Sequence, residues 1–148
     1  MNTMPALYVR NYEHVTHRTN SGHAFANRIA LGIKTIETRG YPAPDSHLGK
    51  RIAIVATYKG KRKSEVVCTA ILRGWKRYEN ENDFIDDFKQ HWVRNQVSPY
   101  RWGSTKEKFG WILEDVQQVD GSEWTVNKGG RVWTTANDFS GHLMEAAS

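Results

Sequence analysis

Residues 32–39 of the chain read GIKTIETR. Apolar and hydroxyl side chains predict a β-strand over residues 33–39, but Lys34, Glu37 and Arg39 place three charges within it. Because side chains alternate along a strand, Glu37 and Arg39 point to the same face. Lys34 stands at the entry of the strand, where its side chain can turn toward that face. The stretch therefore predicts either a partly buried ion pair or a functional site.

The residues before this strand have the spacing of a helix. Residues 23–31 read HAFANRIAL, and Phe25 and Ile29 lie four positions apart on one helical face. Ser21 is a candidate N-cap, and Gly32 stands where a helix commonly ends on a glycine. The carbonyl end of this helix favours a nearby cation such as Lys34.

Composition indicates a globular protein. The 148 residues suit one domain over 1–148, and the formal net charge of +5 is compatible with a polyanionic partner. No apolar run approaches the roughly 20 residues that span a bilayer, and the first residues do not resemble a signal peptide. Cys68 is the one cysteine, within an apolar stretch, and is predicted to be a core residue. We therefore expect a cytoplasmic protein without disulfides or a membrane association.

Apolar patterns predict the other elements. Strands are expected over residues 6–12, 51–58, 66–75 and 109–119, with a basic turn at 59–65 that joins two of them into a hairpin. Residues 80–92 predict one amphipathic helix whose apolar stripe is Phe84, Ile85, Phe88 and Trp92. The fold class is therefore α+β, with a small curved sheet or barrel of mixed strands.

A C-terminal hairpin is expected over residues 124–135. If residues 127–130 (NKGG) form a four-residue turn, Trp124 opposes Trp133 and Val126 opposes Arg131. Cross-strand aromatic pairs stabilise such hairpins. Its role is left open: it can cap the barrel, pair with another subunit or extend a cleft.

At Gly32, Lys34, Glu37 and Arg39 the sequence resembles the ASCH domain (activating signal cointegrator homology) of the PUA-like superfamily, whose pattern is Gly-x-Lys-x-x-Glu-x-Arg after a short helix. Phe25, Ala26 and Ile29 fit the helix of that pattern, and the resemblance spans about residues 24–116. It implies a PUA-type β-barrel with a cleft between the barrel and the first helix, and residues 120–148 as an appended hairpin and tail.

The resemblance also implies function, and three hypotheses stay open. The first is a protein that binds single-stranded RNA or a nucleoside, with metal-independent ribonuclease activity in which Glu37 is the base, Lys34 the acid or electrostatic stabiliser, and Arg39 a phosphate clamp. The second is an amidohydrolase of acetylated cytidine, although that branch has a threonine where Glu37 stands. The third is a non-catalytic reader of modified bases. None needs a cofactor.

Further residues are candidates for nucleic-acid contact. Cations near the basic turn are natural phosphate ligands, and two tryptophans in less regular segments can stack on a base. These candidates are Lys50, Arg51, Lys59, Lys61, Arg62, Lys63, Trp75 and Trp102. Each also has a purely structural explanation, as a solubilising hairpin tip or as core packing. His14, His17 and His23 lack the further ligand that a zinc site needs, so no metal is expected.

Overall fold

The structure, a computed structural model, describes residues 2–11, 25–58, 60 and 62–141. Its strands are β1 (Asn2–Arg10), β2 (Ile36–Arg39), β3 (Arg51–Thr57), β4 (Glu65–Arg77), β5 (Phe109–Gln118), β6 (Trp124–Val126) and β7 (Trp133–Asp138). Its helices are α1 (Phe25–Ala30), α2 (Glu81–Asp86) and α3 (Phe88–His91), with 3-10 turns at Asp45–His47 and Gly121–Glu123. Within the described residues, no helix is long and apolar enough to cross a bilayer.

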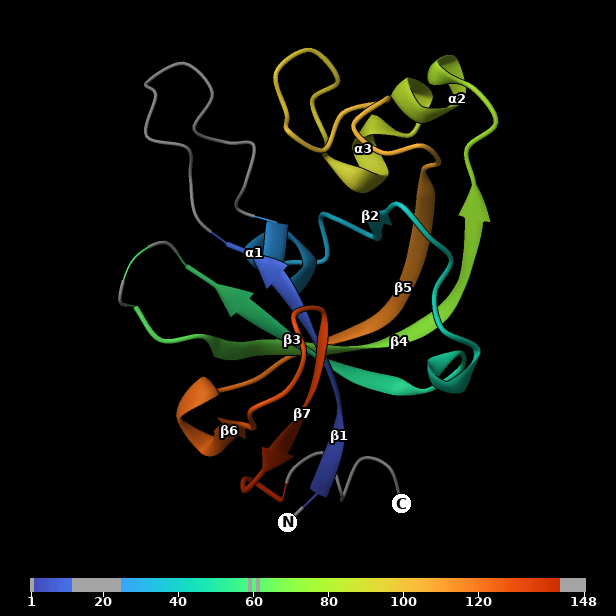
Figure 1. Ribbon diagram of the computed structural model, residues 1–148. Coiled ribbons are helices and arrows are strands. Elements are labelled where there is room, and N and C mark those ends of the chain that lie inside the picture. The colour runs from blue at the N-terminus through green and yellow to red at the C-terminus, as the bar shows by residue number, and fades with distance from the viewer. Residues whose placement is uncertain (1, 12–24, 59, 61, 142–148) are drawn as a thin grey trace.

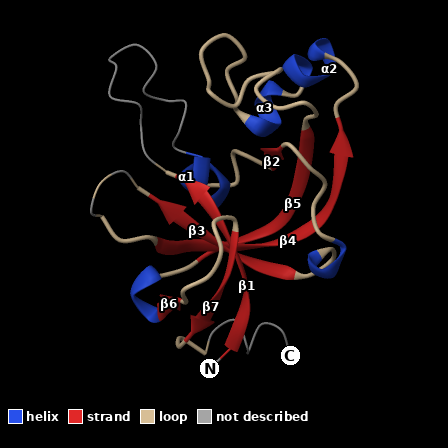
Figure 2. Ribbon diagram, in the orientation of Figure 1, coloured by secondary structure: helices blue, strands red, loops and turns tan. Residues whose placement is uncertain are grey.

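The seven strands form one mixed sheet in the order β2-β5-β4-β3-β1-β7-β6. β1 and β3 are parallel, and the other neighbours are antiparallel. The α+β class is confirmed, but the predicted barrel is wrong, because the described edge strands β2 and β6 do not pair and the sheet stays open. Trp124 of β6 belongs to an apolar cluster that includes Ala53 and Val66. The sheet is nonetheless strongly curved, and α2 and α3 lie beyond one end of β4 and β5 (Figures 1 and 2).

β3 is covered on both faces, as its continuous apolar sequence predicts. Ile52 and Ile54 belong to the larger core, whereas Ala53 and Val55 belong to a second cluster on the opposite face. The hairpin of β3 and β4 and the strand β5 are also confirmed. Cys68 is buried in the larger core as expected, and burial raises the pKa of its thiol to about 12.

α1 delivers the chain to β2 through a glycine turn. Gly32 has φ +75°, and its N–H donates to the carbonyl of Ile29 at 2.9 Å, so the predicted end of the helix is confirmed. A residue with a Cβ is strained in this left-handed region. The predicted start of the helix, including Ser21 and His23, lies outside the described residues. β2 begins at Ile36, three residues later than predicted, and Lys34 precedes it.

Residues 80–92 form two short helices rather than the single predicted one. The Phe84 carbonyl accepts from the Asp87 N–H at 3.2 Å and also lies 2.7 Å from Nε2 of His91. These contacts replace the regular i to i+4 bond, so the helix breaks at Asp87. Ile85, which was predicted to lie on the buried stripe, is consequently 44% exposed, and His91 is buried instead.

The C-terminal hairpin exists, but its predicted register is wrong. Trp124 opposes Asp138, and Val126 opposes Ala136. β7 is aligned by its longer ladder with β1, in which Leu7 opposes Trp133. The ring of Trp133 stacks on Trp111 instead of Trp124, with 5.9 Å between centroids and 15° between planes. Long-range packing therefore decides this register.

Candidate functional site

The three charges of the opening stretch converge around one carboxylate. Arg39 donates to Oε2 of Glu37 from Nη2 at 2.8 Å and from Nε at 3.1 Å. Nζ of Lys34 lies 3.4 Å from the other oxygen, Oε1. A second bond from Arg39 Nη2 reaches the Tyr8 carbonyl at 2.7 Å and ties β2 to β1. Glu37 and Arg39 therefore share a face, as the strand periodicity predicts.

Lys34 lies beneath the site and not in it. Its side chain is 0% exposed, and its Nζ donates to the Ile36 carbonyl at 2.6 Å and to the His91 carbonyl at 2.5 Å. Burial lowers its pKa to about 8, although Glu37 opposes that shift. An ammonium with these partners cannot reach a ligand in this arrangement. The prediction that Lys34 turns into the cleft is therefore wrong, and its observed role is to hold Glu37 and the start of β2.

His91 completes the floor below Lys34. Its ring stacks on Phe84 with 4.3 Å between centroids, Nδ1 accepts from the Val93 N–H at 2.9 Å, and Nε2 faces the Phe84 carbonyl. This pattern fixes the neutral tautomer with hydrogen on Nε2, since one ring nitrogen must accept and the other donate. Burial lowers the pKa of His91 to about 4. The sequence carried a periodic cue for this burial, because His91 lies seven positions after Phe84 and three after Phe88, on the apolar face of the predicted helix.

A cleft of about 830 Å³ opens above Glu37 and Arg39. It is bounded by β1, α1, β2 and the ends of β3 and β4, and by the loops at residues 99–108 and 130–131. Its charged lining comprises four cations and one carboxylate: Arg10, Arg39, Lys108, Arg131 and Glu37. The excess of cations favours an anionic ligand.

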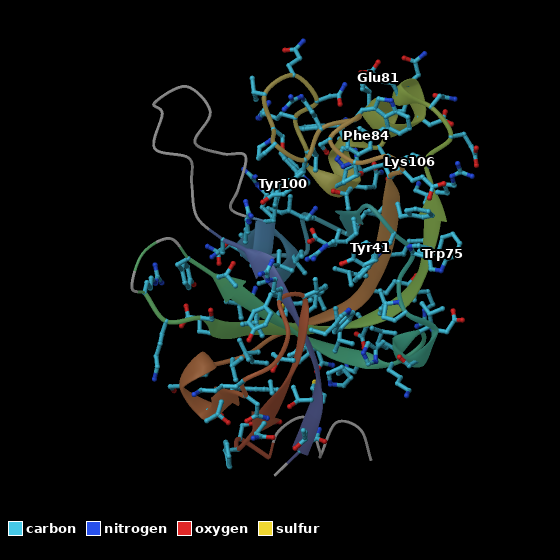
Figure 3. All side chains as sticks on the ribbon, in the orientation of Figure 1. Tyr41, Trp75, Glu81, Phe84, Tyr100 and Lys106 are labelled. Atoms are coloured by element: carbon cyan, nitrogen blue, oxygen red, sulfur yellow. The ribbon has the colours of Figure 1, made fainter. Side chains whose placement is uncertain are left out.

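Aromatic side chains line the same cleft. Tyr8, Phe25, Tyr41 and Tyr100 come from β1, α1 and two separate loops, and Figure 3 labels the two loop tyrosines. Tyr41 is 45% exposed, and its ring packs edge-on against Trp111 at 5.7 Å. The cleft thus combines cations with an accessible aromatic face, the two features that single-stranded nucleic acids use.

Sequence reasoning missed most of these residues. Arg10, Lys108, Arg131, Tyr41 and Tyr100 come from a strand end and three loops, and only the folded chain brings them together. Lys108 carried one usable signal, because it ends an irregular polar segment immediately before an apolar strand.

The predicted basic strip is not continuous. Lys50 and Arg51 lie at one end of β3 and the basic turn at the other, about 20 Å away for seven residues at about 3.3 Å each. Arg51 is also paired with Asp115 and donates to Thr69. Arg62 and Lys63 are exposed, whereas Lys59 and Lys61 lie outside the described residues. The structure therefore separates the two groups, and their contact with nucleic acid stays a prediction.

The two tryptophan candidates do not line the cleft. Trp75 is 41% exposed on β4, where its ring meets Phe109 edge-on at 5.5 Å (Figure 3). Trp102 packs against the larger core, with its ring 6.0 Å from that of Phe84. Trp111 is completely buried. Base stacking by Trp75 or Trp102 stays a prediction that this cleft does not favour.

A metal centre has no candidate ligand set in the part of the chain that the structure describes, where no three His, Cys, Asp or Glu side chains gather. His14, His17 and His23 lie outside that part. The expectation of metal-independent function therefore stays a prediction.

The fold has solved counterparts. The crystal structure of the ASCH protein from Zymomonas mobilis superposes with a TM-score of 0.54 at 23% identity, over 76% of this chain and 69% of that one. A tyrosine-to-phenylalanine variant of it gives 0.55 at 22%, over 78% and 73%. A serine-to-alanine variant gives 0.59 at 16%, over 96% and 95%. No protein-family model and no curated protein matches the sequence. These likenesses show that the chain has the ASCH-domain fold.

Proposed function

We propose that the cleft above Glu37 and Arg39 binds single-stranded RNA. The observation that carries the proposal is its lining, which combines four cations and one carboxylate with three tyrosines, of which Tyr41 is exposed. Cations contact phosphates, and aromatic faces stack on unpaired bases without needing a particular sequence. The volume of about 830 Å³ lies within the range of about 300–1,000 Å³ typical of ligand sites, which suits a short single-stranded segment better than a duplex.

The binding test uses a fluorescently labelled single-stranded RNA and a duplex of the same sequence. We expect the single strand to bind more tightly, with affinity falling steeply from about 50 to about 200 mM salt. Arg131→Ala should weaken binding because Arg131 is exposed in the cleft lining. Lys128→Ala removes the same charge from the same loop outside that lining, and serves as the matched control. Equal effects of the two substitutions, or no binding by the wild type, would refute the proposal.

RNA cleavage is the second candidate activity, and Glu37 is the observation that favours it. It is the one carboxylate in the cleft lining, and it lies beside the cation Arg39. In this proposal Glu37 takes the proton from a 2′-hydroxyl, whose oxygen attacks the adjacent phosphorus, while Arg39 stabilises the charge on the phosphate. The bond from phosphorus to the 5′-oxygen breaks, and the leaving 5′-oxygen takes a proton from water, which gives a 2′,3′-cyclic phosphate and a 5′-hydroxyl end. The test is cleavage of single-stranded RNA in the presence of EDTA. Glu37→Gln should abolish cleavage, whereas cleavage that persists at the wild-type rate would exclude this role.

Amidohydrolysis and base reading are distinguished from RNA cleavage with the same protein samples. Amidohydrolysis by Lys34 has no supporting contact, because its buried Nζ is held by two carbonyls and Glu37. The amidohydrolase hypothesis would be supported if the wild type released acetate from an acetylated cytidine and a folded Lys34→Ala variant did not. Tight binding without turnover of either substrate would favour a reader of bases.

A further inference from the structure

Lys108 differs from the other cations of the cleft, because it is buried without a carboxylate partner. The residue is 4% exposed, yet it lines the cleft. Its Nζ donates to the Tyr100 carbonyl at 3.0 Å and to Ser104 Oγ at 2.8 Å. Among the described residues, no carboxylate oxygen lies within 4.0 Å of this ammonium. Lys108 therefore has neutral partners only.

Two other cations of the region have the carboxylate partner that Lys108 lacks. Lys34 lies beside Glu37, and the guanidinium of Arg39 is paired with the same carboxylate. Buried charges in proteins are normally paired in this way, because removal from water costs free energy that an opposite charge offsets. Burial accordingly lowers the pKa of Lys108, with no acid to oppose the shift. An anionic ligand would supply the absent charge.

The position of Lys108 is fixed by its surroundings. Its carbonyl accepts from the Tyr78 N–H at 3.0 Å, which anchors the backbone to the end of β4. The loop before it is packed against the end of β2, since a Cβ on Gly40 would lie 3.0 Å from Cγ2 of Thr105. Ser104 Oγ accepts from Lys108, so the Ser104 hydroxyl hydrogen can donate to a second acceptor. Two donors are therefore held ready on one wall of the cleft.

On the basis of the proposed function, we infer that Lys108 and the Ser104 hydroxyl bind a phosphate group of the RNA strand. The cleft therefore selects phosphorylated ligands, and a neutral nucleoside lacks its main electrostatic contact. The phosphate can be an internal diester or a terminal monoester, because both present anionic oxygens to the two donors.

The test measures how the affinity of a labelled single-stranded RNA depends on salt. Lys108→Met should weaken binding by about tenfold to a hundredfold, as for a lost hydrogen bond to a charged group. It should also reduce the slope of log affinity against log salt by about 0.7, the value for one phosphate contact on a single strand. Lys106→Met is the matched control, because Lys106 is exposed in the same loop outside the cleft lining (Figure 3). A purely structural lysine would change affinity but leave the slope intact.

Two further measurements complete the test of Lys108. Strands with and without a terminal phosphate distinguish the two phosphate sources. Should Lys108→Met fail to fold, titration of the wild type with inorganic phosphate must shift the backbone amide signals of Lys108 and Ser104 in NMR spectra. An unchanged slope in folded Lys108→Met, or phosphate shifts confined to other residues, would overturn the inference while leaving RNA binding in place. Loss of wild-type RNA binding would instead refute the proposed function.

Discussion

Neutral His91 should make the stability of the protein sensitive to mild acid. The ordinary histidine pKa is 6.5, and burial lowers that of His91 to about 4. Below pH 6.5 the His91 ring is protonated in the unfolded chain but stays neutral in the folded chain. Stability from this residue is therefore complete above pH 6.5 and is lost as the pH falls toward 4. A difference of one pKa unit corresponds to about 1.4 kcal/mol, so roughly 2–3 kcal/mol of the free energy of unfolding is lost at pH 4.5.

The charges that face His91 do not cancel this effect. Lys34 and Lys76 lower its pKa further, while Asp87 raises it. The pKa of Asp87 is itself lowered, mainly by Lys76 and Tyr78 against the effect of burial, so Asp87 stays ionised over this range of pH. Lys34, whose pKa is about 8, remains charged below pH 7. The acid loss therefore belongs to the histidine ring.

The assay compares urea unfolding of the wild type and His91→Gln, followed by tryptophan fluorescence at pH 7.5 and pH 4.5. Glutamine does not titrate but still offers a donor and an acceptor. The wild type should lose roughly 2–3 kcal/mol more than the variant on acidification. If the free energies of unfolding of the two proteins differ by the same amount at both pH values, His91 is not a buried neutral ring.

Three other predictions concern residues around the site. Lys34→Met should lower the free energy of unfolding by about 1–3 kcal/mol, because two buried carbonyls lose their donor, and unchanged stability with lost RNA binding would contradict this. Gly110→Ala should cost about 1–3 kcal/mol in thermal unfolding, since a Cβ would lie 2.8 Å from Cγ2 of Ile36. Gly74→Ala, with open space at that position, is its control and should cost less. Cys68 should resist a thiol reagent at pH 8 until the protein unfolds, because burial raises its pKa to about 12; rapid modification of the folded protein would count against this.

Local signals were enough to predict the region around β2. The helical spacing of Phe25 and Ile29 and the glycine at position 32 located α1, and the period of two placed Glu37 and Arg39 on one face. These features depend on neighbours within a few positions, which a sequence displays directly. The ASCH resemblance was confirmed for the fold.

Contacts between distant segments decided what the sequence could not show. Lys34 was wrongly expected in the cleft, because the His91 carbonyl that draws it inward lies 57 positions away. Trp133 was predicted from the turn length to oppose Trp124 across the hairpin, yet pairing of β7 with β1 set a different register. Lys108 and Arg131 were missed since loop residues carry no periodic signal that reports their common position. Non-local geometry limits such predictions more than composition does.

The bond from Arg39 to the Tyr8 carbonyl affects how a long molecule can enter the site. Both edges of β1 are already paired, with β3 and β7, so β2 is linked to β1 by a side chain and not by a ladder of backbone hydrogen bonds. A side-chain bond can break and reform without loss of the sheet. If that bond opens, an internal segment of a polymer can enter laterally, with no need to thread a free end. If the cleft binds RNA as proposed, circular RNA should compete for it as well as linear RNA of the same sequence.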